Sequence, residues 1–248
     1  MKVFENKHVC ITGADGGIGR EIIKKFAIHG ANVIACCLEE TDSFKEYISK
    51  IMEEYSVNIT PVYFDMSDEQ SIKNGIQEIK ALKIKINVLI NNAGIPHLAI
   101  LSFTKISDAK KVFQINYFAQ IQITQGLLSI IAKDGESVIL NAASIAGIDG
   151  DIGNCVYGAT KASMILFTKV LSKELATSKI RVNAIAPGLT NTAFASAMGN
   201  KAKSSMENIS IMQRLATPDE IANTYYFLAT KEASFINGQV IRVDGGMK

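Results

Sequence analysis

Tyr157 and Lys161 are the pair of residues in this sequence best suited to proton chemistry. On a helix, residues four apart lie on one face, about 6 Å apart along the axis, so both side chains can face one pocket. A free tyrosine has a pKa of about 10, which is too high for efficient proton transfer at neutral pH. Because a neighbouring ammonium favours the phenolate, we expect Lys161 to lower the pKa of Tyr157.

Ser144 is a second candidate, because it lies just past the apolar segment 137–142. In open α/β sheets, the carboxyl ends of the strands face the ligand crevice. The hydroxyl of Ser144 can therefore donate a hydrogen bond to a substrate oxygen whose negative charge grows in the transition state. Taken alone, a tyrosine and a lysine four apart also occur on ordinary helix surfaces, so their meaning depends on such neighbours.

A glycine-rich segment, TGADGGIG over residues 12–19, joins an apolar run to a segment with helical spacing. Glycines at a strand-to-helix turn let backbone N–H groups approach a pyrophosphate, which the positive end of the helix also stabilises. The segment predicts a dinucleotide site, although a glycine-rich turn can also occur without a ligand.

The elements that would position these residues follow one alternating pattern. Short apolar runs predict seven strands, at residues 8–12, 31–37, 59–64, 86–91, 137–142, 180–186 and 239–243. Helical spacing between them predicts helices at residues 18–29, 44–55, 68–82, 105–131, 154–176 and 219–228. Ser67 is expected to cap the third helix, and Pro218 suits the first turn of the last one.

Strands that are apolar throughout indicate a parallel sheet covered on both faces by helices. We therefore expect a doubly wound α/β fold with a parallel sheet of about seven strands. No linker or repeat interrupts the series, so residues 1–248 are interpreted as a single domain with one irregular excursion at residues 190–213.

Composition excludes little but points away from polyanions and membranes. Lysine and arginine number 26 against 24 acidic residues, so we expect neither nucleic acid nor a membrane surface as a partner. The N-terminus is unlike a signal peptide, and no apolar run approaches the roughly 20 residues that span a bilayer, which favours a cytoplasmic location. The four cysteines contain no C-x-x-C pair, so we expect buried, reduced thiols and no metal site.

Five motifs in register resemble the short-chain dehydrogenase/reductase family over essentially the whole chain. TGADGGIG has the family's T-G-x-x-x-G-x-G spacing, and residues 91–94 read NNAG. Asn116 matches a helix asparagine, Ser144 with Tyr157 and Lys161 matches the serine and Y-x-x-x-K, and residues 187–192 resemble PG-x-x-x-T. The resemblance implies a Rossmann-type fold and an NAD(P)-dependent oxidoreductase that interconverts a carbonyl and a secondary alcohol.

The resemblance also implies roles for individual residues. Ser144 would polarise the carbonyl, Tyr157 would donate the proton, Lys161 would also hold the nicotinamide ribose, and Asn116 would bind a water that connects Lys161 to solvent. The positions implied to bind the dinucleotide are Gly13, Asp15, Gly16, Gly17, Ile18, Gly19, Cys37, Leu38, Asp65, Met66, Asn92, Ala93, Gly94, Tyr157, Lys161, Pro187, Gly188, Thr190 and Thr192.

The choice between NAD and NADP stays open. The family's NAD-binding aspartate position holds Cys37, the next holds Leu38, and Gly16 occupies a loop position that is often basic. Glu39 and Glu40 could repel a phosphate only if they face it.

The spacing from NNAG to the PG pair, and the ending with ING at residues 236–238 and VDGGM at residues 243–247, resemble the 3-oxoacyl-acyl-carrier-protein reductases within this family. The segment 129–136 has only Lys133 as a base, which weakens a carrier-protein partner. Asp149 and Asp151 would suit a sugar or polyol substrate, or are simply solvated loop acids. His97 either points into the pocket or sits on a loop.

Proteins with other activities can share this fold. Enoyl reductases and sugar epimerases are two such enzyme classes, and a dinucleotide-binding sensor without turnover is a third possibility from outside the enzymes. Relatives form oligomers, so a homotetramer or homodimer is implied, with Gly158, Ala159 and Ala162 permitting close helix approach.

Overall fold

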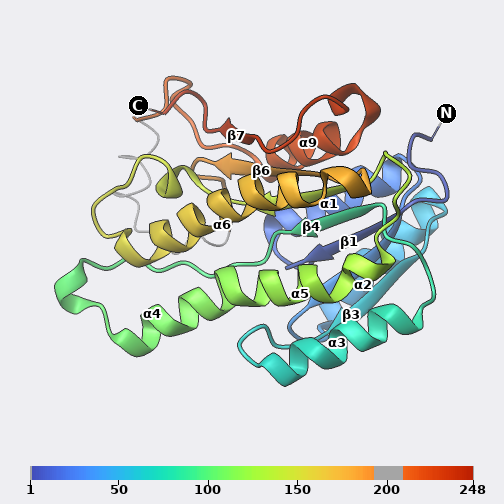
Figure 1. Cartoon of the computed structure of the whole chain (residues 1–248), viewed down its shortest axis with the longest axis horizontal. Coiled ribbons are helices and arrows are strands. Elements are labelled where there is room, and N and C mark those ends of the chain that lie inside the picture. The colour runs from blue at the N-terminus through green and yellow to red at the C-terminus, as the bar shows by residue number, and fades with distance from the viewer. Residues whose placement is uncertain (1, 193–208, 248) are drawn as a thin grey trace.

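The computed structural model describes residues 2–192 and 209–247, so most of the predicted excursion lies outside the described residues. Seven parallel strands form one sheet in the order β3-β2-β1-β4-β5-β6-β7 (Figure 1). The strands are β1 (His8–Thr12), β2 (Asn32–Cys37), β3 (Ile59–Tyr63), β4 (Val88–Asn91), β5 (Val138–Ala142), β6 (Arg181–Pro187) and β7 (Val240–Val243). The predicted doubly wound parallel sheet is confirmed.

Helices cover both faces of the sheet, and each face has its own apolar core. One face is covered by α1 (Gly17–Ile28), α2 (Asp42–Tyr55) and α9 (Pro218–Ala229). The other face is covered by α3 (Glu69–Ala81), α5 (Ala119–Leu127) and α6 (Cys155–Glu174). No helix in the described part of the chain is long and apolar enough to cross a membrane.

The segment predicted as one helix over residues 105–131 is interrupted, and that prediction is corrected. It consists of α4 (Ile106–Phe113), a π-helical turn η2 (Gln114–Phe118), α5 and a short 3₁₀ turn at Leu128–Ile130. Turns of π-helix contain an extra residue and are frequent at functional sites. Asn116 lies within this turn.

Three smaller predictions are also corrected. Asp68, rather than Ser67, caps α3, because its carboxylate accepts the hydrogen bond from the N–H of Gln70. Cys155 is exposed, whereas the other three thiols are buried as expected. Gly158, which was expected to permit close approach of a helix from another subunit, faces the 3₁₀ turn η4 (Ile145–Gly147) of its own chain. An added Cβ there would lie 2.6 Å from the carbonyl oxygen of Ala146.

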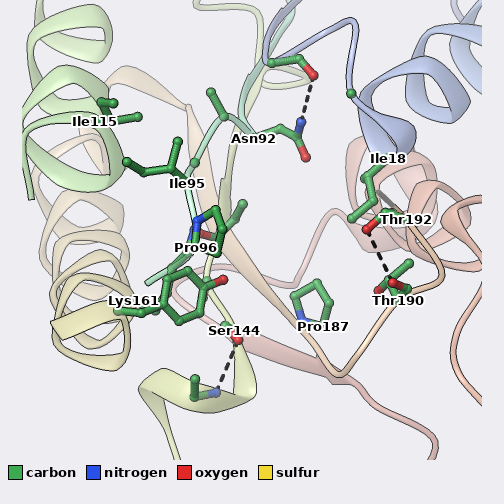
Figure 2. Close-up of a pocket in the computed structure, with 18 of the residues that line it drawn as sticks. Ile18, Asn92, Ile95, Pro96, Ile115, Ser144, Lys161, Pro187, Thr190 and Thr192 are labelled. Carbon is green, nitrogen blue, oxygen red and sulfur yellow. Dashed lines mark hydrogen bonds between the residues drawn. The ribbon is translucent and has the colours of Figure 1, made fainter. Parts of the chain in front are cut away.

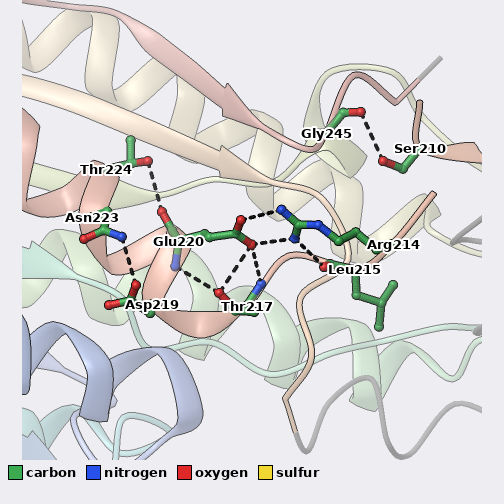
Figure 3. A network of polar contacts seen from close by, with 9 residues as sticks. All are labelled: Ser210, Arg214, Leu215, Thr217, Asp219, Glu220, Asn223, Thr224 and Gly245. Atoms are coloured by element: carbon green, nitrogen blue, oxygen red, sulfur yellow. Dashed lines mark hydrogen bonds and ion pairs between the residues drawn. The ribbon is translucent and has the colours of Figure 1, made fainter. Parts of the chain in front are cut away.

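The start of α9 is fixed by a network of polar contacts (Figure 3). Thr217 and Glu220 form a capping box, in which each side chain accepts a hydrogen bond from the other residue's backbone N–H. Arg214 donates two hydrogen bonds to the Glu220 carboxylate, at 2.8 and 2.6 Å. Pro218 lies in the first turn as predicted. The network ties the end of the excursion to α9.

Candidate active site

One cavity of about 1170 Å³ follows the carboxyl ends of the strands. Its volume is larger than the range of about 300–1,000 Å³ that is usual for small-molecule sites. A cavity that holds both a dinucleotide and a substrate is expected to be this large. All of the predicted dinucleotide-binding positions, from Gly13 to Thr192, line it, and so does Ser144. The topology brings these residues together because parallel strands place their carboxyl ends along one edge.

The glycine segment has the geometry of a phosphate cradle. Gly13 has a φ of +65°, and a Cβ there would lie 2.9 Å from the Cα of Ala93. A Cβ on Gly19 would lie 2.1 Å from the carbonyl oxygen of Gly13. Gly16 precedes α1, and no side chain of the described residues caps that end. The first N–H groups of α1 therefore remain available to an anion, so these residues fit a bound pyrophosphate.

Thr12 and Asn92 fix the cradle to the loop after β4. The Thr12 hydroxyl oxygen accepts hydrogen bonds from the N–H groups of Asn92 and Ala93, both at 3.0 Å. The Asn92 amide donates to the carbonyl oxygens of Thr12 and Gly13, at 3.2 and 3.3 Å, and Figure 2 draws one of these two bonds. The NNAG motif thus positions backbone around the cavity, and Thr12 is a positioning residue that we did not predict from the sequence.

Thr192 lies on the other side of the cradle. A Cβ on Gly17 would meet its Cγ2 atom at 3.1 Å, so the two segments are packed closely. Its hydroxyl donates to the carbonyl oxygen of Thr190 at 3.4 Å (Figure 2). The preceding Gly188 N–H donates to the carbonyl oxygen of Val243, which joins this segment to the end of β7.

Ser144, Tyr157 and Lys161 meet where β5, η4 and the first turns of α6 come together. The side chains of Ser144 and Tyr157 are hydrogen-bonded to each other. Lys161 is only 4% exposed, its Nζ donates to the carbonyl oxygen of Ala142 at 2.9 Å, and it lies 5.7 Å from the centroid of the Tyr157 ring. The three predicted residues therefore form one cluster at the cavity.

The electrostatics of the cluster differ from our expectation. Burial raises the pKa of Tyr157, and the hydrogen bond with Ser144 opposes that shift. Burial also lowers the pKa of Lys161 to about 8. The expectation that Lys161 lowers the pKa of Tyr157 is therefore wrong for this structure, because desolvation dominates. A neutral phenol is the form of tyrosine that donates a proton.

Asn116 is buried beside this cluster and does not line the cavity among the described residues. Its Oδ1 accepts from the N–H of Ile95 at 2.8 Å, and its amide donates to the carbonyl oxygen of Ile95 at 3.0 Å. A Cβ on Gly94 would lie 3.2 Å from this Oδ1 and 3.4 Å from the Nζ of Lys161. Asn116 thus braces the segment after β4, and its predicted water contact stays a prediction.

At the other end of the cavity, β2 and β3 end at Cys37 and near Asp65. Burial raises the pKa of the Cys37 thiol to about 12, so it stays protonated. A backbone hydrogen bond from Ser67 holds the pKa of Asp65 below its usual value. Arg20, which the sequence did not single out, donates to the carbonyl oxygen of Asp15 and to the Ser43 hydroxyl.

The substrate end of the cavity contains residues that the sequence left undecided. His97 lines the cavity, and its buried Nδ1 has no hydrogen-bond partner in the described structure. Asp149 pairs with Arg242 at 2.7 Å, and Asp151 accepts a hydrogen bond from the N–H of Ile152. Both acids therefore have protein partners.

Comparison with known proteins identifies the family to which this chain belongs. Residues 13–248 match a family model described as enoyl-(acyl carrier protein) reductase. The chain is 35% identical to the 3-oxoacyl-[acyl-carrier-protein] reductase of Thermotoga maritima, over 98% of each chain. The chain belongs to the short-chain dehydrogenase/reductase family. It is an NAD(P)-dependent oxidoreductase that interconverts carbonyl and alcohol groups.

Two solved structures show the same fold with nucleotides bound. A short-chain dehydrogenase from Burkholderia cenocepacia in complex with NADP is 25% identical, with a TM-score of 0.92 over 98% of each chain. The L-sorbose reductase of Gluconobacter frateurii, complexed with NADPH and L-sorbose, is 26% identical, with a TM-score of 0.91 over 100% of this chain and 98% of that one. The predicted family and NAD(P) chemistry are confirmed, and the choice between NAD and NADP stays open.

Proposed function

We propose that this enzyme reduces the 3-oxo group of an acyl chain. The observation that carries the proposal is the apolar lining around Ser144 and Tyr157, to which Ile95, Leu98, Ile145, Leu189 and Met247 contribute. Because Arg242 neutralises Asp149, the acidic loop gives less support to a polar substrate than its composition indicated. The similarity to a 3-oxoacyl reductase over nearly the whole chain also supports this substrate class.

In the proposed mechanism, Ser144 donates a hydrogen bond to the substrate oxygen, and the neutral phenol of Tyr157 gives that oxygen its proton. The ammonium of Lys161, held by the carbonyl of Ala142, stabilises the phenolate that remains after Tyr157 gives up its proton, until a proton from solvent restores the phenol. Asn116 positions the Ile95 segment through two backbone hydrogen bonds. Hydride transfer is the chemistry that a nicotinamide supplies when bound, and the dinucleotide positions from Gly13 to Thr192 would hold it.

A sugar or polyol is the second candidate substrate, favoured by the polar residues His97, Asp151 and Asn154 in the same cavity. A substrate panel separates the two. We expect acetoacetyl-CoA and longer 3-oxoacyl thioesters to be reduced with a higher kcat/KM than L-sorbose, each measured with NADH and with NADPH. Faster reduction of L-sorbose would replace the acyl proposal by the sugar one.

A homotetramer or homodimer is part of this proposal. Exposed apolar side chains on α4 and α6 support it, namely Ile106, Leu166 and Val170, together with Phe103 and Phe118 nearby. Light scattering coupled to gel filtration would detect the oligomer, and a monomer at micromolar concentration would contradict it. A single domain over residues 1–248 and a cytoplasmic location remain expectations, to be tested by limited proteolysis and cell fractionation.

A further inference from the structure

Tyr225 lies between the catalytic cluster and the core, in a place where the family motifs predict nothing. It belongs to α9, which packs against α1 and against β5 and β6. Only 1% of the residue is exposed, yet it is one of the residues that line the cavity. Tyr157 is near enough that its phenolate form adds to the effect of burial in raising the pKa of Tyr225.

The hydroxyl oxygen of Tyr225 is buried and has no hydrogen-bond partner among the described residues. A buried hydroxyl left without a partner destabilises the folded protein, because it has lost its hydrogen bonds to water. Such groups are rare in folded proteins, and each one indicates a bound water, a ligand or stored strain. The free protein therefore carries a cost at this position that a ligand could remove.

The surroundings of Tyr225 indicate from which side a partner would come. The other buried residues in its core cluster are apolar, and they include Leu140, Ile185, Ile221 and Leu228. No side chain among the described residues is within hydrogen-bond distance of the hydroxyl. Because Tyr225 lines the cavity, a polar group bound there could reach the hydroxyl.

We propose that the hydroxyl of Tyr225 donates a hydrogen bond to the nicotinamide half of the bound dinucleotide. The catalytic residue Tyr157 marks that half of the cavity, whereas Cys37 and Asp65 mark the adenosine half. The acceptor in that half that suits a phenol is the amide carbonyl of the nicotinamide. The proposal concerns the dinucleotide and does not depend on which carbonyl substrate the enzyme reduces.

The test replaces Tyr225 by phenylalanine, which removes the hydroxyl and keeps the ring. Because the hydroxyl lacks a partner in the free protein, Y225F should leave the Tm unchanged or raise it. The same variant should weaken the binding of NADH and NADPH by about three- to ten-fold, measured by fluorescence titration without substrate. Binding of ADP, which keeps both phosphates but lacks the nicotinamide and its ribose, should not change.

Tyr226 on the same helix provides a matched control. It packs against Phe4 and Phe26 and stacks on His29, and it does not line the cavity as described. Y226F should leave the affinity for both dinucleotides unchanged. A lower Tm of Y225F with unchanged dinucleotide affinity would overturn the proposal in favour of a structural water. Equal weakening of ADP and NADPH binding would also overturn it.

Discussion

Arg242 and Asp149 lie 93 residues apart in the sequence, and a guanidinium N–H of Arg242 donates to Asp149 Oδ1 over 2.7 Å. The same guanidinium donates to Asp244 and to the carbonyl oxygen of Met247. Since Asp149 and Met247 both line the cavity, Arg242 ties the loop between Ser144 and Tyr157 to the segment after β7. We interpret Arg242 as a positioning residue for the substrate end of the site.

Replacing Arg242 by glutamine should therefore affect catalysis more than stability. Arg242 and Asp149 are 34% and 44% exposed, so their pair should contribute less than about 1 kcal/mol to the free energy of unfolding. We expect kcat/KM to fall about three- to ten-fold through a higher substrate KM, because the loop loses its tether. D149N should show part of this loss, and the double variant no more than R242Q alone. K50Q, which breaks an exposed pair on α2, is the control.

Tyr157→Phe should abolish turnover while leaving dinucleotide binding nearly intact. The phenol is the only proton donor in the proposed mechanism, so kcat should fall by about 10²–10⁴-fold. Ser144→Ala should lower kcat as well, because it removes the hydrogen bond to the substrate oxygen and the one to Tyr157. Steady-state kinetics and a fluorescence titration with NADPH measure both effects. Unchanged turnover of Y157F would show that another residue donates the proton.

Lys161→Met should lose activity but not stability. Burial lowers the pKa of Lys161 from 10.5 to about 8, so the folded protein bears the cost of a buried ammonium at all pH values below 8. As pH rises from 8 to 10.5, the unfolded chain keeps the proton longer, and the free energy of unfolding of the wild type increases.

K161M should thus be as stable as the wild type or more stable at pH 7, by at most about 3 kcal/mol. The advantage should shrink toward pH 10. Thermal melts at pH 7 and pH 9.5 measure it, and an advantage that grows with pH would contradict the sign of the pKa shift. Loss of the hydrogen bond to Ala142 reduces the difference without changing its pH dependence.

Thr217→Ala should destabilise the start of α9 (Figure 3). It removes the side chain that caps the helix, which costs about 0.5–2 kcal/mol. Arg214 holds the pKa of Glu220 at about 2, so the charged carboxylate stabilises the network above pH 4.5. That contribution is lost as pH falls from 4.5 to 2. Thermal melts should show a lower Tm for T217A and little change for T217S.

Gly19→Ala and Gly16→Ala should differ sharply in dinucleotide binding. A Cβ on Gly19 would overlap the carbonyl oxygen of Gly13, whereas on Gly16 it would be 3.4 Å from that oxygen, an ordinary contact. We expect G19A to abolish NADH and NADPH binding and G16A to retain it within about two-fold. Loss of binding in both variants would mean that Gly16, like Gly19, has no room for a side chain when the dinucleotide is bound.

The sheet and most of the cavity lining could be predicted because they depend on local patterns. Buried parallel strands need continuous apolar runs, which can be read from the sequence. The glycines of residues 12–19 are spaced as the backbone of a tight strand-to-helix turn requires. The interruption of residues 105–131 could not be predicted, because a π-turn has the same composition as an α-helix. The cap of α3 was misplaced by one residue, since Ser67 and Asp68 are adjacent acceptors.

Contacts between distant segments were beyond the reach of the sequence. Arg242 meets Asp149, and Tyr225 reaches the cavity, only because β7 and α9 pack beside the catalytic cluster. The direction of the Tyr157 pKa shift was missed for the same reason. The burial that raises the pKa of Tyr157 depends on the whole fold, whereas the sequence shows only that Tyr157 and Lys161 are four residues apart.

The π-turn at Gln114–Phe118 has a consequence for the whole rod from α4 to α5. One extra residue changes the angular phase of a helix by about 100°. Upstream of the turn the rod buries Val112, and downstream it buries Ala119, Ile123 and Leu127 against α3. The turn lets Asn116 face Ile95 without rotating that downstream face out of the core. Deleting one residue between residues 114 and 118 would restore a regular α-helix from α4 to α5. Asn116 could then no longer face Ile95 while α5 keeps its buried face against α3.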